Sequence, residues 1–128
     1  MQVIYDKKRK SSNKILITGA AGFIGYHVSH LLLSEGWVVV GVDAITDYYD
    51  VNLKVERLNL LKRSKNFHFE KISIQDEEFI KKFKNENFHS IIHLAAQAGV
   101  RYSIENPRTY LDTNLIGTFN VLELAKFG

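Results

Sequence analysis

The residues with the clearest chemical potential form a glycine-rich segment at 18–25, which reads TGAAGFIG. Its glycines, Gly19, Gly22 and Gly25, recur at a spacing that permits a tight turn, close backbone approach to a pyrophosphate, and close packing of a helix on a strand. The helix after such a turn presents free N–H groups and a partial positive charge to phosphates. Glycines can also serve any strand-to-helix turn structurally, so the triplet alone is a weak signal. An apolar run before it and a helical pattern after it favour dinucleotide binding.

Asp43 is the second residue with a defined chemical role. It ends the next apolar run, 18 positions after Gly25, where a carboxylate can accept hydrogen bonds from an adenosine ribose. A carboxylate there repels the 2′-phosphate of NADP, and the sequence places no arginine or lysine within the turn or beside Asp43. These features predict NAD as the cofactor. The alternative is an aspartate that only caps its own loop.

The histidines are the natural candidates for metal binding. His27 and His30 share one face of a predicted helix, but no carboxylate or third histidine is placed to complete a site, so a surface pair is expected. His68, His89 and His93 lie around predicted strands, and we assign them no metal role. No serine, histidine and aspartate arrangement of nucleophilic type is visible in the sequence.

Alternating strands and helices must position these residues. The apolar patterns predict strands at 15–18, 37–42, 67–72 and 90–94, and helices at 22–35, 52–62, 76–86 and 107–126. This alternation implies parallel pairing with right-handed crossovers and a sheet covered on both faces. The expected fold is a doubly wound α/β sheet with strand order 3-2-1-4. A fifth strand is expected beside the fourth, and the sequence does not contain it.

Composition limits the class of protein. A chain of 128 residues with 45% hydrophobic and 24% charged residues is expected to form one globular domain. No apolar run reaches the roughly 18 to 20 residues that span a bilayer, and the N-terminus lacks a signal-peptide core, so neither a membrane role nor export is expected. The absence of cysteine suits a reducing compartment, and we expect the cytoplasm.

The net charge of +3 depends on one basic cluster, KKRK at 7–10. Without it the balance is slightly negative, and neither interleaved aromatic residues nor a continuing basic face accompanies it, so nucleic-acid binding is not expected. We interpret residues 1–13 as a flexible basic tail and residues 14–128 as a partial NAD-binding domain.

The glycine segment together with HLAAQ at 93–97 resembles the extended short-chain dehydrogenase/reductase family. Within it, DYYDVNLK at 47–54 and QAGVRYSIENP at 97–107 resemble UDP-glucuronate 4-epimerases, which are also found as capsular polysaccharide biosynthesis proteins. The resemblance covers nearly everything from Lys14 onward. It implies a Rossmann-like fold and the NAD-binding N-terminal part of a UDP-sugar 4-epimerase.

The resemblance also implies residue roles. Phe23 and Ile24 would flank the pyrophosphate, and Asp43 would hold the adenosine ribose. The nicotinamide side would be lined by Leu94, Ala95 and Ala96. Asn114 would support the cofactor loop, unless it is a helix asparagine with a backbone partner. Arg101 would face the substrate, unless it is a surface arginine paired with Glu105.

Two positions depart from the family pattern, both in the adenosine pocket. Ser73 stands where an aspartate usually receives the adenine amino group, and Ala44 stands where an asparagine usually follows Asp43. Losing each partner could cost roughly 1–3 kcal/mol of binding, so weak NAD binding is expected.

The catalytic residues of the family are also missing. Its mechanism needs a Tyr-x-x-x-Lys pair, and none of the six tyrosines here has a lysine four positions later. The chain alone is therefore predicted to be inactive, with no catalytic residue assigned. A non-catalytic nucleotide- or protein-binding module, or a decayed gene fragment, are the alternatives.

The last predicted helix and the fourth strand suggest association. One stripe of the helix carries Leu111, Leu115, Phe119 and Leu122, and another carries Tyr110, Asn114, Gly117, Val121 and Leu124. Only one stripe can cover the sheet, and the strand at 90–94 is expected to be a sheet edge. We therefore predict self-association, or binding of a separate C-terminal half, through these surfaces.

Overall fold

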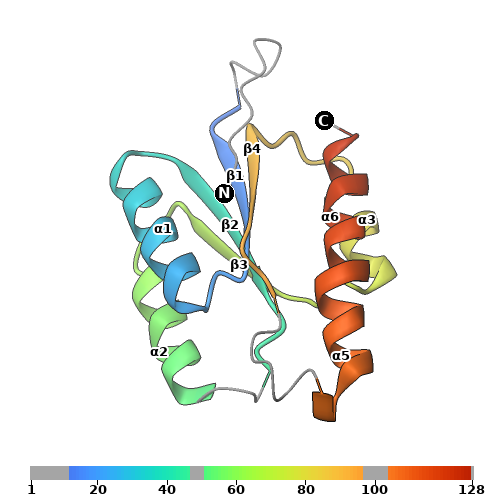
Figure 1. Cartoon of the computed structure of the whole chain (residues 1–128). Helices are drawn as coiled ribbons and strands as arrows, with labels where there is room; N and C mark the ends of the chain where they lie inside the picture. Colours follow the sequence, from blue (N-terminus) through green and yellow to red (C-terminus); the bar gives the residue numbers. More distant parts are fainter. Residues whose placement is uncertain (1–11, 47–50, 97–103, 128) are drawn as a thin grey trace.

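A parallel four-stranded sheet forms the centre of the molecule. The structure, a computed structural model, describes residues 12–46, 51–96 and 104–127. The strands are β1 (Lys14–Thr18), β2 (Val38–Asp43), β3 (Phe67–Lys71) and β4 (Ser90–His93). They lie in the order β3-β2-β1-β4, which confirms the predicted order (Figure 1). The chain adds strands on one side of β1 as far as β3 and then returns to place β4 on the other side, parallel to β1. This strand switch between β1 and β4 is the point where doubly wound sheets bind ligands.

Helices cover both faces of the sheet (Figure 1). One face carries α1 (Phe23–Ser34) and α2 (Val51–Leu61). The other carries α3 (Glu77–Phe83) and the last helix, which consists of α5 (Pro107–Leu111), η2 (Asp112–Ile116) and α6 (Gly117–Ala125). Pro107 occupies the first turn of α5, where its missing N–H costs no hydrogen bond.

Alternation along the strands gives each face its own hydrophobic core. The core beneath α1 and α2 contains Ile15, Ile17, Val39, Leu58, Leu61 and Phe67. The core on the opposite face contains Leu16, Val40, Val42, Phe79, Phe83, Val121 and Leu124. Successive residues of β1 and β2 thus enter different cores, and this explains why these strands are apolar along their whole length.

The last helix differs from its prediction. An unbroken α-helix was expected over 107–126, but the turn Asp112–Ile116 is a π-helix. Next to it, Gly117 packs so closely that a Cβ atom would lie 2.6 Å from the side chain of Ile74, and Asn120 Nδ2 donates to the carbonyl of Ile74 at 2.8 Å. A π turn inserts one extra residue and shifts the register of the next helical turns, here beside these contacts. The other elements match their predictions within a few residues; the largest difference is α3, which ends at Phe83.

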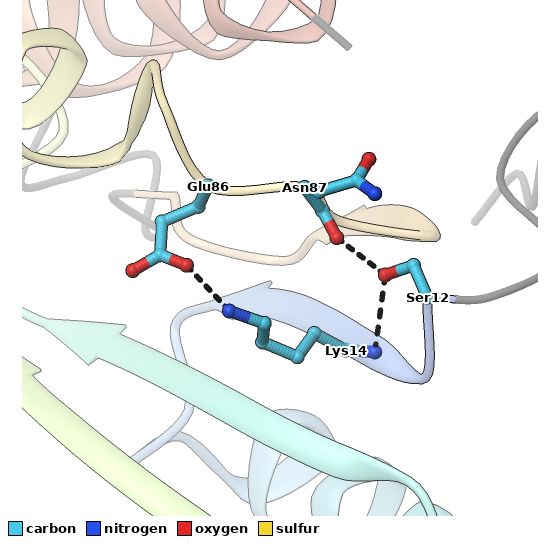
Figure 2. Close-up of polar contacts among 4 residues, drawn as sticks. All are labelled: Ser12, Lys14, Glu86 and Asn87. Carbon is cyan, nitrogen blue, oxygen red and sulfur yellow. Dashed lines mark hydrogen bonds and ion pairs between the residues drawn. The ribbon is translucent and has the colours of Figure 1, made fainter.

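The start of β1 is fastened to the segment that precedes β4. Lys14 Nζ lies 2.6 Å from Glu86 Oε2, and Ser12 Oγ donates to the carbonyl of Asn87 (Figure 2). The carbonyl of Asn13 also accepts from Val38 N at 2.9 Å. The described end of the predicted tail therefore contacts the fold. The flexible character of the rest of segment 1–13 stays a prediction, because residues 1–11 lie outside the described residues.

Candidate functional site

The glycine turn between β1 and α1 is closed too tightly for side chains. A Cβ on Gly25 would lie 2.0 Å from the carbonyl oxygen of Gly19, and a Cβ on Gly19 would lie 2.8 Å from the backbone N of Ala95. Gly19 also has a φ of +75°, which side chains disfavour. Gly22 has more room, since its Cβ would lie 3.3 Å from the Gly19 oxygen. The turn therefore needs glycine at 19 and 25 for packing, and it presents bare backbone to the space outside.

A cavity of about 670 Å³ opens at the carboxyl ends of the strands. It lies beside the glycine turn and is bordered by the ends of β2, β3 and β4 and the start of α2. Nearly all predicted site residues line it: Gly19, Gly22, Phe23, Ile24, Gly25, Asp43, Leu94, Ala95 and Ala96. A volume of this size is typical of a cofactor or small-molecule site.

Four further residues singled out from the sequence have different outcomes. Ser73 and Ala44, the departures from the family pattern, both line the cavity. Asn114 does not, although its neighbour Thr113 does. Asn114 lies in the π turn, where its carbonyl accepts from the Thr118 hydroxyl at 2.7 Å. Arg101 lies outside the described residues.

Asp43 is held in place by its surroundings. Its Oδ2 accepts from Ala21 N at 3.1 Å in the glycine turn, and its Oδ1 accepts from Ile45 N at 2.8 Å in its own loop. Asp43 therefore caps its own loop, as the alternative interpretation of this residue proposed. Lys54 Nζ lies 3.8 Å from Asp43 Oδ1, and the two side chains are only 10% and 9% exposed.

Two basic residues of α2 reach the predicted adenosine end of the cavity. Besides Lys54, Arg57 Nη1 donates to the carbonyl of Ala21 at 3.1 Å, and its guanidinium lies 5.9 Å from the centre of the Phe23 ring. No lysine or arginine lies within the turn or beside Asp43 along the sequence, but the fold brings these two from α2 to both places. Their spacing in the sequence could have indicated this, because Lys54 and Arg57 lie three positions apart in the first turns of α2 and helix residues three apart share a face.

His93 links β4 to its neighbours. Its Nδ1 lies 2.6 Å from the hydroxyl of Thr18 in β1, and its Nε2 lies 3.0 Å from the hydroxyl of Thr118 in α6. Partial burial lowers the pKa of His93 below its ordinary value. From the sequence, His93 was given no metal role and was part of the HLAAQ motif, and its contacts with the two threonines were not predicted.

The predicted histidine pair, His27 and His30, lies on the surface of α1. The His27 ring meets Phe23 edge-on at 4.7 Å, and His30 lies 6.2 Å from the Tyr26 ring. Among the described residues, no group of three or more histidine, aspartate or glutamate side chains is arranged to hold a metal ion.

The described helices are also too short or too polar to cross a bilayer.

A cavity over a glycine turn, at the strand switch of a parallel sheet, defines a dinucleotide-binding class of protein. Residues 16–127 match the family model described as GDP-mannose 4,6 dehydratase. The chain therefore belongs to this family, whose members are NAD-dependent epimerases and dehydratases. The resemblance inferred from the sequence is confirmed.

Individual relatives point to one branch of the family. The chain is 53% identical over 112 residues to the UDP-glucuronate 4-epimerase of Thermodesulfobacterium geofontis, covering 87% of this chain and 35% of the relative. It is 50% identical over 114 residues to Protein CapI of Staphylococcus aureus, covering 88% and 34%. The Bacillus cereus UDP-glucuronic acid 4-epimerase, solved with UDP-glucuronic acid and NAD, superposes with a TM-score of 0.79 at 34% identity, covering 88% and 36%. The chain thus spans about a third of the length of these relatives and matches their N-terminal, NAD-binding part.

Proposed function

We propose that the chain binds NAD in the cavity at the strand switch, as the N-terminal part of a UDP-sugar 4-epimerase that acts on UDP-glucuronate. One observation carries the proposal: Gly19, Gly25 and Asp43 border the same cavity, and the two glycines sit where a Cβ would collide with backbone. Bare backbone at a helix N-terminus is what a pyrophosphate requires. The residues present therefore fit the cofactor.

The proposed roles follow the length of the cavity. The glycine turn holds the pyrophosphate, with Phe23 and Ile24, which are 66% and 61% exposed, on its open side. The Asp43 carboxylate accepts hydrogen bonds from the ribose hydroxyls of adenosine. At the opposite end, the nicotinamide lies against the loop Leu94, Ala95 and Ala96. Asn114 supports this loop from the last helix, and Arg101 meets the sugar nucleotide.

The adenosine end is proposed to bind weakly. Ser73 and Ala44 replace an aspartate and an asparagine of the family pattern, and both border the cavity. Each adenine or ribose group left without a hydrogen-bond partner would reduce the binding free energy of NAD by roughly 1–3 kcal/mol.

The chain by itself is proposed not to epimerise a UDP-sugar. NAD, when bound, supplies a hydride acceptor for the sugar C4. A tyrosine base with a neighbouring lysine must take the hydroxyl proton in this family, and this sequence contains no Tyr-x-x-x-Lys. Incubation of the chain with UDP-glucuronate and NAD should yield no product above a denatured control, and turnover would contradict the proposal.

An exposed apolar stripe supports a partner for this chain. Leu111, Leu115, Phe119 and Leu122 of the last helix are 45%, 64%, 59% and 62% exposed, while Val121 and Leu124 cover the sheet. Of the other predicted stripe, Gly117, Val121 and Leu124 are buried, whereas Tyr110 is 37% exposed. We propose that a second copy, or a separate C-terminal half, covers the stripe. Binding without catalysis remains the second candidate function, and cytoplasmic residence stays a prediction.

Calorimetric titration with NAD tests the main proposal. We expect saturable binding of NAD, weaker binding of NADP, and no binding by the Gly25→Ala variant. The absence of NAD binding by the folded wild-type chain up to about 1 mM, which corresponds to about 4 kcal/mol of binding free energy, would contradict it.

A further inference from the structure

The hydroxyl of Thr18 is the centre of a buried hydrogen-bond cluster. Its Oγ1 accepts from Leu94 N at 3.0 Å and from Ala95 N at 3.1 Å, and it lies 2.6 Å from His93 Nδ1. A hydroxyl has one proton to donate and two lone pairs to accept with. The Leu94 amide is shared, because it also donates to the backbone carbonyl of Thr18 at 3.2 Å. Among the described partners of the Thr18 hydroxyl, His93 Nδ1 is the one that can accept its proton, so the proton points to that nitrogen. That nitrogen is therefore an acceptor and carries no proton.

The other side of His93 leads to the same tautomer. Thr118 Oγ1 donates to the carbonyl of Asn114 at 2.7 Å, so its single proton is already used. The 3.0 Å contact between His93 Nε2 and Thr118 Oγ1 then requires that Nε2 carries the proton. Hydrogen-bond donation thus runs in one direction, from the amides of 94 and 95 through Thr18, His93 and Thr118 to Asn114. Successive hydrogen bonds in such a series polarise one another, and each becomes stronger than it would be alone.

This chain of hydrogen bonds joins three parts of the cavity wall. Thr18 directly precedes Gly19, whose missing Cβ leaves room for the backbone of Ala95. Leu94 and Ala95 line the cavity, and so does Thr113, which shares the π turn with Asn114. The glycine turn, the loop after β4 and the π turn are therefore fastened to one another through one imidazole.

We propose that His93 is a positioning residue: as a neutral imidazole protonated on Nε2, it holds the loop of Leu94 and Ala95 against the π turn. This loop forms the nicotinamide end of the cavity, so the consequence for NAD rests on the proposed function. His93 itself does not line the cavity. Its effect on the cofactor is therefore indirect, through Thr18 and the two amides that Thr18 holds.

The surroundings of the ring match a neutral imidazole. The groups that face it from β1 and α6 are the hydroxyls of Thr18 and Thr118, and no carboxylate is among its hydrogen-bond partners in the described part of the chain. Its burial lowers the pKa, in agreement with the neutral form. A proton on Nδ1 would face the Thr18 proton. If the hydroxyl turned to accept it, Thr18 Oγ1 could hold only one of the two amides, and the Leu94 amide would be left with the Thr18 carbonyl at 3.2 Å.

Nitrogen NMR of the wild-type chain tests the tautomer without cofactor or mutation. Long-range proton–nitrogen spectra of a ¹⁵N-labelled chain distinguish a protonated from an unprotonated ring nitrogen, and the signals of His93 are those missing from His93→Gln. We expect an Nε2-protonated, neutral ring at neutral pH. An Nδ1-protonated ring, a charged ring, or averaging like that of a free histidine would overturn the proposal.

Three threonine variants test the positioning. Thr118→Val removes the acceptor of His93 Nε2, Thr118→Ser keeps it, and Thr109→Val makes the same change at an exposed residue of α5. In Thr118→Val we expect faster hydrogen exchange of the Leu94 and Ala95 amides and NAD binding weaker by about 3- to 10-fold, the effect of about one hydrogen bond. The serine variant and Thr109→Val should behave as wild type.

The outcomes separate this proposal from the proposed function. Unchanged amide exchange in a folded Thr118→Val, checked by circular dichroism, overturns the positioning role. So does unchanged NAD affinity in a chain that binds NAD. A wild-type chain that shows the expected tautomer and exchange but binds no NAD contradicts the proposed function instead.

Discussion

Lys54 Nζ lies 3.8 Å from Asp43 Oδ1 in a pair that is about nine-tenths buried. Asp43 also accepts hydrogen bonds from Ala21 N and Ile45 N, so its carboxylate is oriented before any ligand arrives. The lysine offsets part of the negative charge that would repel a 2′-phosphate. Selectivity for NAD over NADP is therefore expected to be smaller than an isolated aspartate would give.

Replacing this lysine tests the charge balance. Lys54→Gln should increase the ratio of NAD to NADP affinity, because the uncompensated carboxylate repels the 2′-phosphate more strongly. It should also lower the free energy of unfolding by about 1–3 kcal/mol, since a partly buried charge loses its partner. Calorimetry and urea unfolding measure the two effects. Lys65→Gln, an exposed residue after α2, is the control, and an unchanged affinity ratio in Lys54→Gln would refute the role assigned to the pair.

Alanine substitutions in the glycine turn should act in proportion to the space available. Gly25→Ala should abolish NAD binding and destabilise the fold by about 1–3 kcal/mol, because its Cβ would lie 2.0 Å from Gly19 O. Gly22→Ala, with 3.3 Å, should be milder. Gly36→Ala provides the control: it has no neighbour within 4 Å but a φ of +91°, so it should lose about 1–2 kcal/mol of stability and keep NAD affinity. Equal NAD affinity in all three would contradict the assigned site.

A carboxylate at position 73 should improve cofactor binding. If adenine lies where we propose, Ser73→Asp provides a partner for its amino group at the cavity wall. The variant should then tighten NAD binding by about 1–2 kcal/mol, or roughly 5- to 30-fold. Ser73→Ala is the matched control and should not tighten it. If both variants bind like wild type, the adenine does not lie where we propose.

Stability should fall in mild acid because of His93. Burial holds its pKa in the folded chain below the value of 6.5 expected when unfolded. As pH falls below that value the unfolded chain binds the extra proton first, so the contribution is complete above it and is lost as pH falls through the folded pKa. Urea unfolding between about pH 7 and pH 5 should therefore show a steeper loss for wild type than for His93→Gln. Parallel profiles would mean that the pKa of His93 is the same in both states.

Charges on the exposed stripe of the last helix should prevent association. The wild-type chain is expected to form dimers or larger species as concentration rises, whereas Leu115→Lys or Leu122→Lys should remain monomeric with unchanged stability. Light scattering over a concentration series measures this. Leu31→Lys, at an exposed residue of α1 on the opposite face, should associate like wild type. A wild-type monomer at the highest concentration would argue against the stripe as an interface.

The sequence by itself determined the elements and the chemistry of the turn. Glycine spacing, alternating apolar runs and an aspartate at a strand end are local signals, because each reflects the conformation or the packing of its own segment. They predicted the β3-β2-β1-β4 order and four of the residues that line the cavity, Gly19, Gly22, Gly25 and Asp43. Five more, Phe23, Ile24, Leu94, Ala95 and Ala96, came from the family resemblance. Helical periodicity also predicted that the last helix has two apolar stripes of which one covers the sheet, but the structure decided that Val121 and Leu124 are the buried ones.

Only the tertiary structure decided which side chains meet across the sheet. Thr18 and His93 are 75 positions apart, and His93 meets Thr118 only because the last helix crosses the face of β4. Lys54 reaches Asp43 because α2 packs beside the glycine turn, although nothing near Asp43 in the chain is basic. The π turn was also decided by the tertiary structure. The i, i+4 pattern of residues 107–126 is that of a regular α-helix, and the extra residue of the π turn lies next to the contact of Gly117 with Ile74. These features depend on the docking of distant segments, which periodicity and local propensity do not encode.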